Sequence, residues 1–282
     1  LRHVLASFRV RAPENVAEGS YGLAAVAEAD GGRRYAEGFE VVDYPHIRRA
    51  LLFEDARTRV SVFPVRVDRE LRLGYVMGSG DDGAEALRQL GIDVRLLGPE
   101  EVREADFGSF DVIVLGVRAY ETRPDLVSSN AQLLDWVEEG GTLLVQYNKY
   151  EFSGAGYAPY PVRISRPHDR VTDETAPVTI LDPDSPVFTS PNRITAEDFE
   201  GWAQERGLYF LGEWDERYTP LLSMHDAGEE GKRGSLLVAP VGDGLWIYTG
   251  LAFFRQFPEG VPGAYRLFAN LVSLEASEWP AR

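Results

Sequence analysis

Residues 71–82 constrain the fold of this chain more than any other stretch. They read LRLGYVMGSGDD, in which an apolar run leads into a Gly-Ser-Gly turn, and residues 84–91, AEALRQLG, continue with helical spacing. A strand, a glycine turn and a helix in this order make the first part of a βαβ unit. Because open α/β sheets usually hold their ligands beside such turns, this stretch also predicts where a binding crevice would lie.

From residue 70 onward, strand-like and helix-like segments alternate. We predict further strands at 92–97, 110–117 and 142–147, and an amphipathic helix at 125–139. The segment at 110–117 is nearly all apolar, as expected for a parallel strand that is buried on both faces. A later hairpin at 235–249 completes the pattern. The pattern predicts an α/β fold with a doubly wound, mainly parallel sheet in the strand order 2-1-3-4.

The first 69 residues follow a different pattern, in which apolar and polar residues alternate as in β-strands. A first strand is expected at 4–10, and a hairpin turn at Asp30-Gly31-Gly32. We predict a small all-β, sandwich-like domain at 1–69, followed by the α/β domain at 70–282. Because 69 residues are few for a self-sufficient sandwich, we expect this domain to be truncated or to pack against its neighbour.

Composition argues against several classes of partner. The net charge is −16, with 45 acidic against 29 basic residues spread along the chain, so nucleic acid and anionic membranes are not expected partners. No apolar run approaches the roughly 18 residues of a membrane span. Cysteine is absent, which rules out disulfides, thiolate metal sites and a cysteine nucleophile. Since the chain starts at Leu1 without a methionine, we expect a fragment or a processed product.

The turn at 78–80 is similar to loops that cradle phosphate, which are also rich in glycine and precede a helix. Asp81 and Asp82 argue against phosphate, because they already occupy the positive end of the helix dipole and would repel an anion. Capping of the helix by Ser79 or Asp81 is the favoured interpretation. A hydroxyl-rich or cationic ligand beside Ser79, Gly80, Asp81 and Asp82 is the alternative.

Polar residues also follow the third and fourth predicted strands. In the order 2-1-3-4, Arg118 and Tyr120 would face Ser79 across the crevice between the first and third strands. An ion pair of Arg118 with one of the two aspartates after the turn is the alternative. Gln146 and Asn148 end the fourth strand at the same edge, where some hydrolases carry a nucleophile on a tight elbow. Neither Ser nor Cys stands there, so no catalytic residue is predicted.

Glu205 and Arg206 lie near several aromatic residues in the sequence, among them Trp202 and Tyr209. Aromatic rings beside carboxylates bind sugars in many proteins, but the same residues also close hydrophobic cores. The candidate ligand-binding residues of the crevice are Ser79, Gly80, Asp81, Asp82, Arg118, Tyr120, Gln146, Asn148, Glu205 and Arg206.

The four histidines do not predict a metal site. Two of them stand in the doublets His168-Asp169 and His225-Asp226, which lack the spaced, converging ligands of metal sites. Hydrogen bonding within loops is the favoured interpretation, and neither a metal nor another cofactor is predicted. The segment at 148–200 is rich in Pro, Asp, Arg and Tyr, and a segment of this length is usually functional or a lid.

Three motifs carry a resemblance to a known family: GYVMGSGDD at 74–82, GVRAY at 116–120 and TGLAFFRQFP at 249–258. With them the chain resembles the C-terminal part of long bacterial deacetylases of the LmbE/PIG-L type. In that family a zinc-dependent N-acetylglucosaminyl deacetylase precedes β-sandwich material and a flavodoxin-like domain similar to class I glutamine amidotransferases. The resemblance covers most of residues 71–282 and implies a flavodoxin-like sheet.

Two departures from the family limit what the resemblance implies. The deacetylase signature, a His-Pro-Asp-Asp run, is absent, and the Cys-His-Glu triad of the amidotransferases lacks its cysteine. We therefore expect no zinc site and no glutaminase chemistry in this chain. The sequence does not fix the compartment, and the resemblance is compatible with a secreted or periplasmic protein.

The leading hypothesis is a non-catalytic accessory region of a larger carbohydrate deacetylase-like hydrolase. Such a region would bind a glycan or another small polar ligand, or pack against other domains of the same protein. One alternative is a free-standing hydrolase that acts on an amide or sugar derivative, with Asp81, Asp82 or Glu205 as general acid or base. The other alternative is a structural or oligomerising module.

Overall fold

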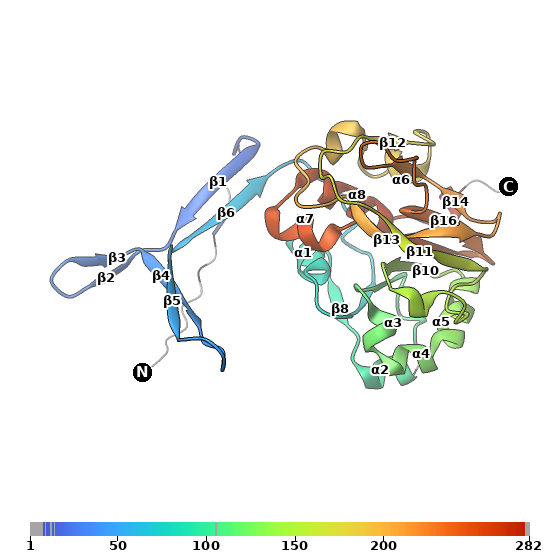
Figure 1. Ribbon diagram of the computed structural model, residues 1–282, viewed down its shortest axis with the longest axis horizontal. Coiled ribbons are helices and arrows are strands. Elements are labelled where there is room, and N and C mark those ends of the chain that lie inside the picture. The colour runs from blue at the N-terminus through green and yellow to red at the C-terminus, as the bar shows by residue number, and fades with distance from the viewer. Residues whose placement is uncertain (1–7, 9, 12, 14, 105, 280–282) are drawn as a thin grey trace. The chain divides into compact units, whose positions relative to one another are not determined.

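The computed structural model describes residues 8, 10, 11, 13, 15–104 and 106–279 (Figure 1). The chain divides into two compact units, Leu1–Pro64 and Val65–Arg282. The first unit is built from β-hairpins, and the second from a mostly parallel sheet with helices on both faces.

The first unit contains three two-stranded antiparallel sheets. Gly31 and Gly32 have φ angles of 84° and 75° and form a hairpin turn, as the sequence predicts. The strand predicted at 4–10 lies largely outside the described residues. The strand pairs are β1 Gly19–Ala24 with β6 Arg57–Val62, β2 Ala27–Ala29 with β3 Arg33–Tyr35, and β4 Glu37–Val42 with β5 Ala50–Asp55.

The prediction of an all-β first unit is confirmed, but its described residues do not form a sandwich. None of the residues described between 8 and 64 is buried. The pairing of β4 with β5 places Phe39 opposite Phe53 and Val41 opposite Leu51, so one face of this sheet is apolar. These four side chains are between 40% and 62% exposed. A sandwich needs a second sheet over such a face, and the described part of this unit does not supply one.

The second unit is organised around a seven-stranded sheet in the order β14-β16-β17-β10-β9-β7-β8. Strands β8, β7, β9 and β10 are parallel neighbours, which confirms the predicted order 2-1-3-4. The predicted hairpin is β16–β17, and it joins the sheet through β17, which runs parallel to β10. The strands are β7 Leu73–Val76, β8 Val94–Leu96, β9 Val112–Leu115, β10 Thr142–Gln146, β14 Thr219–Pro220, β16 Leu236–Val241 and β17 Gly244–Thr249.

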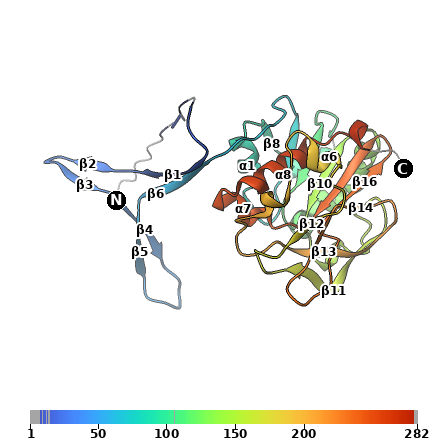
Figure 2. The same ribbon diagram turned by 90° about the horizontal axis from the view of Figure 1, so that it is seen from above.

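Helices cover both faces of this sheet (Figures 1 and 2). One face carries α1 Gly83–Gln89, α7 Phe253–Glu259 and α8 Pro262–Val272, which contact one another. The other face carries α2 Pro99–Glu104, α3 Ala119–Thr122, α4 Pro124–Ser128 and α5 Asn130–Glu138. Because strand side chains alternate in direction, Tyr75 and Gln146 point to the first face, whereas Val145 and Tyr248 join the core on the second.

One predicted helix differs in the structure. The helix predicted at 125–139 is two helices, α4 and α5, because Ser129 between them has φ −101° and ψ 10° and is not helical. Residues 196–199 form a short 3₁₀ segment, η2 Ala196–Phe199, which Thr195 and Asp198 cap reciprocally.

The long segment at 148–200 is ordered by pairing with later strands. β11 Val162–Val171 pairs antiparallel with β13 Gly207–Trp214, and β12 Val178–Ile180 pairs with β15 Leu222–Met224 (Figure 2). The β11–β13 ladder is interrupted, because Ile164 pairs with Leu211 and the next pair is Asp169 with Phe210. Residues 165–168 therefore form a bulge in β11. The short helical pieces are η1 Tyr150–Phe152, α6 Pro186–Thr189 and η3 Ala276–Glu278.

Candidate functional site

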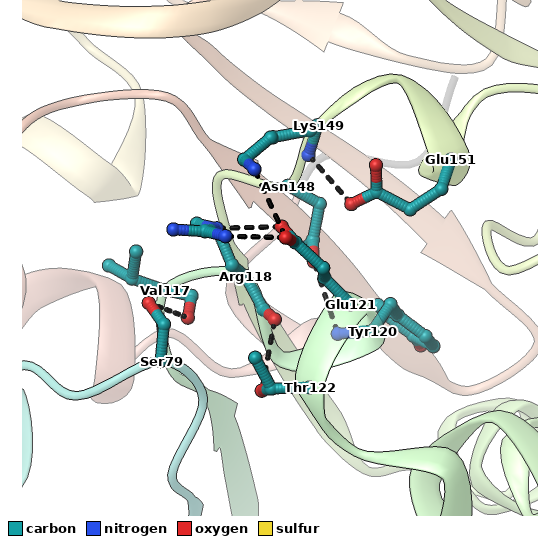
Figure 3. Close-up of polar contacts among 9 residues, drawn as sticks. All are labelled: Ser79, Val117, Arg118, Tyr120, Glu121, Thr122, Asn148, Lys149 and Glu151. Atoms are coloured by element: carbon teal, nitrogen blue, oxygen red, sulfur yellow. Dashed lines mark hydrogen bonds and ion pairs between the residues drawn. The ribbon is translucent and has the colours of Figure 1, made fainter.

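The turn after β7 contacts the turn after β9 directly. The amide and the hydroxyl of Ser79 both donate to the carbonyl oxygen of Val117, at 2.8 and 3.2 Å (Figure 3). A Cβ atom at position 78 would lie 2.0 Å from the same oxygen, so only glycine fits this close approach. The two loops that flank the predicted crevice are therefore in contact at Gly78 and Val117. Both hydrogen-bond donors of Ser79 are used within the protein.

Asp81 is bonded to three elements around this contact. Its Oδ1 accepts from the hydroxyl of Tyr75 at 2.5 Å and from the amide of Gly83 at 2.9 Å, and its Oδ2 accepts from the amide of Val117 at 3.0 Å. Capping of the helix by Asp81 is thus confirmed, since the Gly83 amide belongs to the first turn of α1. Gly80 and Asp82 lie exposed beside this carboxylate.

The hydroxyl of Tyr75 continues this network into the sheet. It accepts from Nε2 of Gln146 at 2.8 Å while it donates to Asp81. Burial raises the pKa of the Tyr75 hydroxyl well above its usual range, and the charge of Asp81 raises it further, so this group stays a neutral donor. The chain Gln146–Tyr75–Asp81 ties β10, β7, β9 and α1 together beneath the carboxyl edge of the sheet.

The polar groups of Tyr120 and Asn148 also make hydrogen bonds within the protein. The hydroxyl of Tyr120 donates to Oδ1 of Asn130 at 2.6 Å, and its amide donates to Oδ1 of Asn148 at 3.1 Å. Asn148 in turn donates to the carbonyl oxygen of Gln146 at 3.0 Å. Both side chains are buried, and Tyr120 stacks on Tyr157 with ring centroids 4.5 Å apart.

The side chain of Arg206 makes its hydrogen bonds to two main-chain carbonyl groups. Its guanidinium is buried and donates to the carbonyl oxygen of Ala176 through Nε and Nη2, at 3.0 and 2.8 Å, and to that of Phe199 through Nη1. Burial lowers the pKa of Arg206. This arginine joins two loop segments through their carbonyl groups.

Arg118 stands at the end of β9 in a left-handed backbone conformation, with φ 58° and ψ 33°. Its Nε donates to Glu121 at 2.7 Å, its Nη2 bonds to the same carboxylate, and Nζ of Lys149 reaches that carboxylate at 3.0 Å (Figure 3). The side chains of Arg118, Glu121 and Lys149 are 30%, 29% and 33% exposed. The predicted alternative, a pair of Arg118 with Asp81 or Asp82, is wrong, because Glu121 on the adjoining turn of α3 lies within reach and takes the guanidinium.

Glu121 should make stability depend on pH. Hydrogen bonds from Arg118 lower the pKa of Glu121 from 4.5 to about 2, with help from Lys149 and against the effect of burial. Because the folded pKa lies below the unfolded one, the stabilisation is present above about pH 4.5 and is lost as the pH falls toward 2. We expect Glu121→Gln to lower the free energy of unfolding by up to about 1 kcal/mol at pH 7.

Urea unfolding of wild type and Glu121→Gln between pH 7 and pH 3 would measure this effect. The gap between the two proteins should narrow below about pH 4.5 and in high salt. The exposed Glu200→Gln is the matched control and should show no such trend. A gap that stays constant over the whole pH range would contradict the assignment.

Tyr147, directly after β10, lies at the centre of an aromatic stack. Its ring stacks on Tyr209 with centroids 5.7 Å apart and is tilted against Phe254 at the same distance. Tyr209 also stacks on His168, at 4.0 Å. The amide of Arg118 donates to the carbonyl oxygen of Tyr147 at 2.9 Å. Burial raises the pKa of the Tyr147 hydroxyl, the charge of Arg118 opposes this, and Glu205 adds to it.

A second ion pair borders the same ring. Nε of Arg255 donates to Oε1 of Glu205 at 2.6 Å, and Nη1 of Arg255 bonds to Oε1 of Gln204. The guanidinium of Arg255 lies over Phe254, 4.9 Å from the ring centroid. We call Arg118, Tyr147, Gln204, Glu205, Tyr209 and Arg255 the Tyr147 cluster.

Three residues of the Tyr147 cluster have left-handed backbones. Among the described non-glycine residues, positive φ angles occur at Arg118, Gln204 and Tyr209, with values of 58°, 67° and 52°. Such conformations are uncommon in residues with a Cβ atom and concentrate where the surroundings enforce them. Tyr147 and Asn148 are not among them, so the strained elbow that carries nucleophiles in some hydrolases is not formed after β10.

Two members of the Tyr147 cluster, Arg118 and Glu205, were candidate ligand-binding residues from the sequence. Tyr147 was not a candidate, although strand alternation directs its side chain away from the face of Gln146. Tyr209 was noted only as one of the aromatic residues near Glu205, and Gln204 and Arg255 were not candidates. Their approach to Tyr147 depends on tertiary contacts between segments that are far apart in the chain.

No set of three or more His, Asp or Glu side chains in the described part of the chain could hold a metal ion. Its helices are also too short or too polar to cross a membrane.

Comparisons with known proteins find similarity in structure only. No protein-family model matches the chain, and no curated protein matches it in sequence. A cytoplasmic protein of Salmonella typhimurium is 13% identical, with a TM-score of 0.49 over 91% of this chain and 96% of that one. A ThuA-like protein of Bacteroides uniformis is 13% identical, with a TM-score of 0.45 over 74% of this chain and 93% of that one.

A β-galactosidase of Bacillus circulans is also 13% identical, with a TM-score of 0.48. The similarity covers 73% of this chain and 31% of the β-galactosidase. Likenesses at this level concern the arrangement of strands and helices and do not assign an activity to the chain.

Proposed function

We propose that the chain is a non-catalytic accessory region of a larger carbohydrate-active hydrolase, and that it binds a glycan or another small polar ligand at the Tyr147 cluster. The observation that carries the proposal is the convergence of three left-handed non-glycine residues, Arg118, Gln204 and Tyr209, on one place. Each such residue costs of order 1–3 kcal/mol and persists only where the surrounding structure holds it. Strain of this kind gathers at ligand sites more often than elsewhere.

The chemistry of the Tyr147 cluster favours binding over catalysis. It combines two guanidinium groups and the Glu205 carboxylate with a tyrosine hydroxyl whose raised pKa keeps it neutral. Such groups donate to and accept from sugar hydroxyls, and aromatic faces pack against sugar rings. A hydrolase that uses Asp81 as general acid or base has less support, because that carboxylate already accepts three hydrogen bonds within the protein.

Arg118 supplies the test. Calorimetry with a panel of glycans and small polar molecules should find a ligand, and Arg118→Ala should weaken its binding by at least about tenfold. Arg118→Gly should weaken binding equally while the fold keeps its stability, because glycine relieves the left-handed backbone and offsets the lost ion pair.

The matched control is Arg163→Ala, which removes an exposed ion pair with Glu213 on β11 and β13 and should leave binding unchanged. Absence of any ligand in the panel, or an affinity that Arg118→Gly does not change, would refute binding at the Tyr147 cluster.

The reading frame upstream of Leu1 in the gene would test the association with a deacetylase. A His-Pro-Asp-Asp run in the same reading frame upstream of Leu1 would support it. A frame that encodes an unrelated catalytic domain would replace it with another parent enzyme.

A further inference from the structure

A groove of about 940 Å³ lies beside β11 and β13, outside the Tyr147 cluster. His168 of the β11 bulge and the following Asp169 and Arg170 line one side, together with Leu211 and Trp214 of β13. The opposite wall is the loop at 229–233. This volume falls in the range of about 300–1,000 Å³ that small-molecule sites occupy.

Both walls are fixed before any ligand arrives. The loop is held at its start by Asp226, whose carboxylate accepts from the amides of Thr172 and Asp173 at 2.9 Å and from the Thr172 hydroxyl at 2.8 Å. Paired backbone hydrogen bonds between Met224 and Lys232, at 3.1 and 2.8 Å, close the segment that contains most of this loop. A site whose walls are already ordered loses little entropy on binding.

The bulge at 165–168 shapes the other wall. It adds four residues to β11 between successive pairs with β13 and so turns His168 onto Tyr209, at a centroid distance of 4.0 Å. The main-chain amide of His168 is held by the hydroxyl of Tyr150 at 3.1 Å. Bulges commonly re-aim side chains next to functional sites, and this one joins the groove to the aromatic stack of the Tyr147 cluster.

Trp214 gives the groove an aromatic surface. Of the five tryptophans in the chain, the other four are buried and Trp214 is partly exposed. It packs against the hydrophobic core and also lines the groove. An indole of this kind can stack on the apolar face of a sugar ring while its N–H stays available for a hydroxyl.

The charges that line the groove nearly cancel. Asp169 stands next to Arg170 in β11 directly after the bulge, and Glu229 and Glu230 lie close in sequence to Lys232 and Arg233 on the loop. Because both walls carry acids as well as bases, a charged ligand gains little net attraction and meets repulsion from the groups of its own sign. A neutral ligand with many hydroxyls can instead use the carboxylates as acceptors and the cations as donors.

We propose that this groove is a second ligand site, specific for neutral oligosaccharides, in which Trp214 is the stacking platform and the charged pairs of the bulge and the loop bind the hydroxyls. This inference names a ligand class for the accessory region and uses residues other than those of the Tyr147 cluster. The two sites can therefore be tested separately.

Titration of the whole chain with short neutral cello-, manno- and galacto-oligosaccharides tests the groove. At least one series should give a saturable change in tryptophan fluorescence, because Trp214 is partly exposed and lines the groove. Trp214→Ala should weaken that binding by at least about tenfold, and so should the double variant Glu230→Ala with Arg233→Ala, which alters exposed loop residues only. Arg118→Gly should leave this affinity unchanged.

Four results would overturn the inference. The first three are that no neutral oligosaccharide binds, that an oligouronide binds more tightly than its neutral counterpart, and that the affinity is unchanged in the double variant. The fourth is an affinity that Arg118→Gly removes and the groove variants do not, which would place the saccharide at the Tyr147 cluster and support the proposed function there. Affinity that is lost in the groove variants and kept in Arg118→Gly would place the saccharide in the groove. The two proposals can therefore fail independently.

Discussion

Asp81→Ala should destabilise the protein by about 3–5 kcal/mol and lower its melting temperature by roughly 6–15 °C. The substitution removes the acceptor of three donors at once: the hydroxyl of Tyr75 and the amides of Gly83 and Val117. The Tyr75 hydroxyl is fully buried, and a buried donor without a partner costs about 1–3 kcal/mol. Urea or thermal unfolding followed by circular dichroism measures the loss.

Asp82→Ala is the matched control for this experiment. Asp82 is the neighbouring carboxylate in the same turn, but it is exposed and its side chain does not cap α1, so we expect a change within about 0.5 kcal/mol. In a double-mutant cycle, Tyr75→Phe should recover part of the loss caused by Asp81→Ala, because it removes the stranded donor. Equal losses for Asp81→Ala and Asp82→Ala would show that the network contributes no stability.

Arg206→Lys should cost about 2–4 kcal/mol even though it preserves the charge. Arg206 is 4% exposed, and its guanidinium uses all three of its nitrogen atoms on the carbonyl oxygens of Ala176 and Phe199. A lysine has one nitrogen on a flexible stem and cannot reproduce this fork, so at least one buried carbonyl loses its donor. The loss appears as a lower urea midpoint at an unchanged m-value.

The exposed Arg193→Lys provides the comparison and should change the midpoint little. If Arg206→Lys behaves like this control, the fork to the two carbonyls is not what holds these loops. From the sequence, Arg206 was a candidate ligand-binding residue together with its neighbour Glu205. A loss of stability in Arg206→Lys would instead assign it a structural role.

The fold could be predicted in detail where the local pattern matches the local environment. The segment at 110–117 is almost wholly apolar because β9 is buried on both faces, and this property survives in any arrangement of neighbours. The order 2-1-3-4 is the one that flavodoxin-like doubly wound sheets adopt, and the alternation of strands and helices predicts a sheet of this class. The break at Ser129 was missed because the apolar spacing of the two helices continues across it.

The prediction that the first unit is built from β-strands was correct. The prediction that these strands pack as a sandwich was wrong for the described residues. Alternation along β4 and β5 gives one apolar face, and the sequence implies that such a face is covered. Alternation does not say what covers it. In the described part of this unit Phe39 and Phe53 contact each other and remain exposed, so pairing within the hairpin does not complete a core.

The sequence by itself determined the α/β architecture, the glycine turn at 78–80 and the lack of a cysteine nucleophile, because these depend on periodicity, on local turn residues and on composition. Tertiary structure alone decided the partners of Asp81 and Arg118 and the assembly of the Tyr147 cluster. That cluster joins residues from 118 to 255, brought together by the edge of the sheet and the β11–β13 ladder. Side-chain partners depend on distances in space. When the segments lie so far apart in the chain, their spacing in the sequence does not predict these distances.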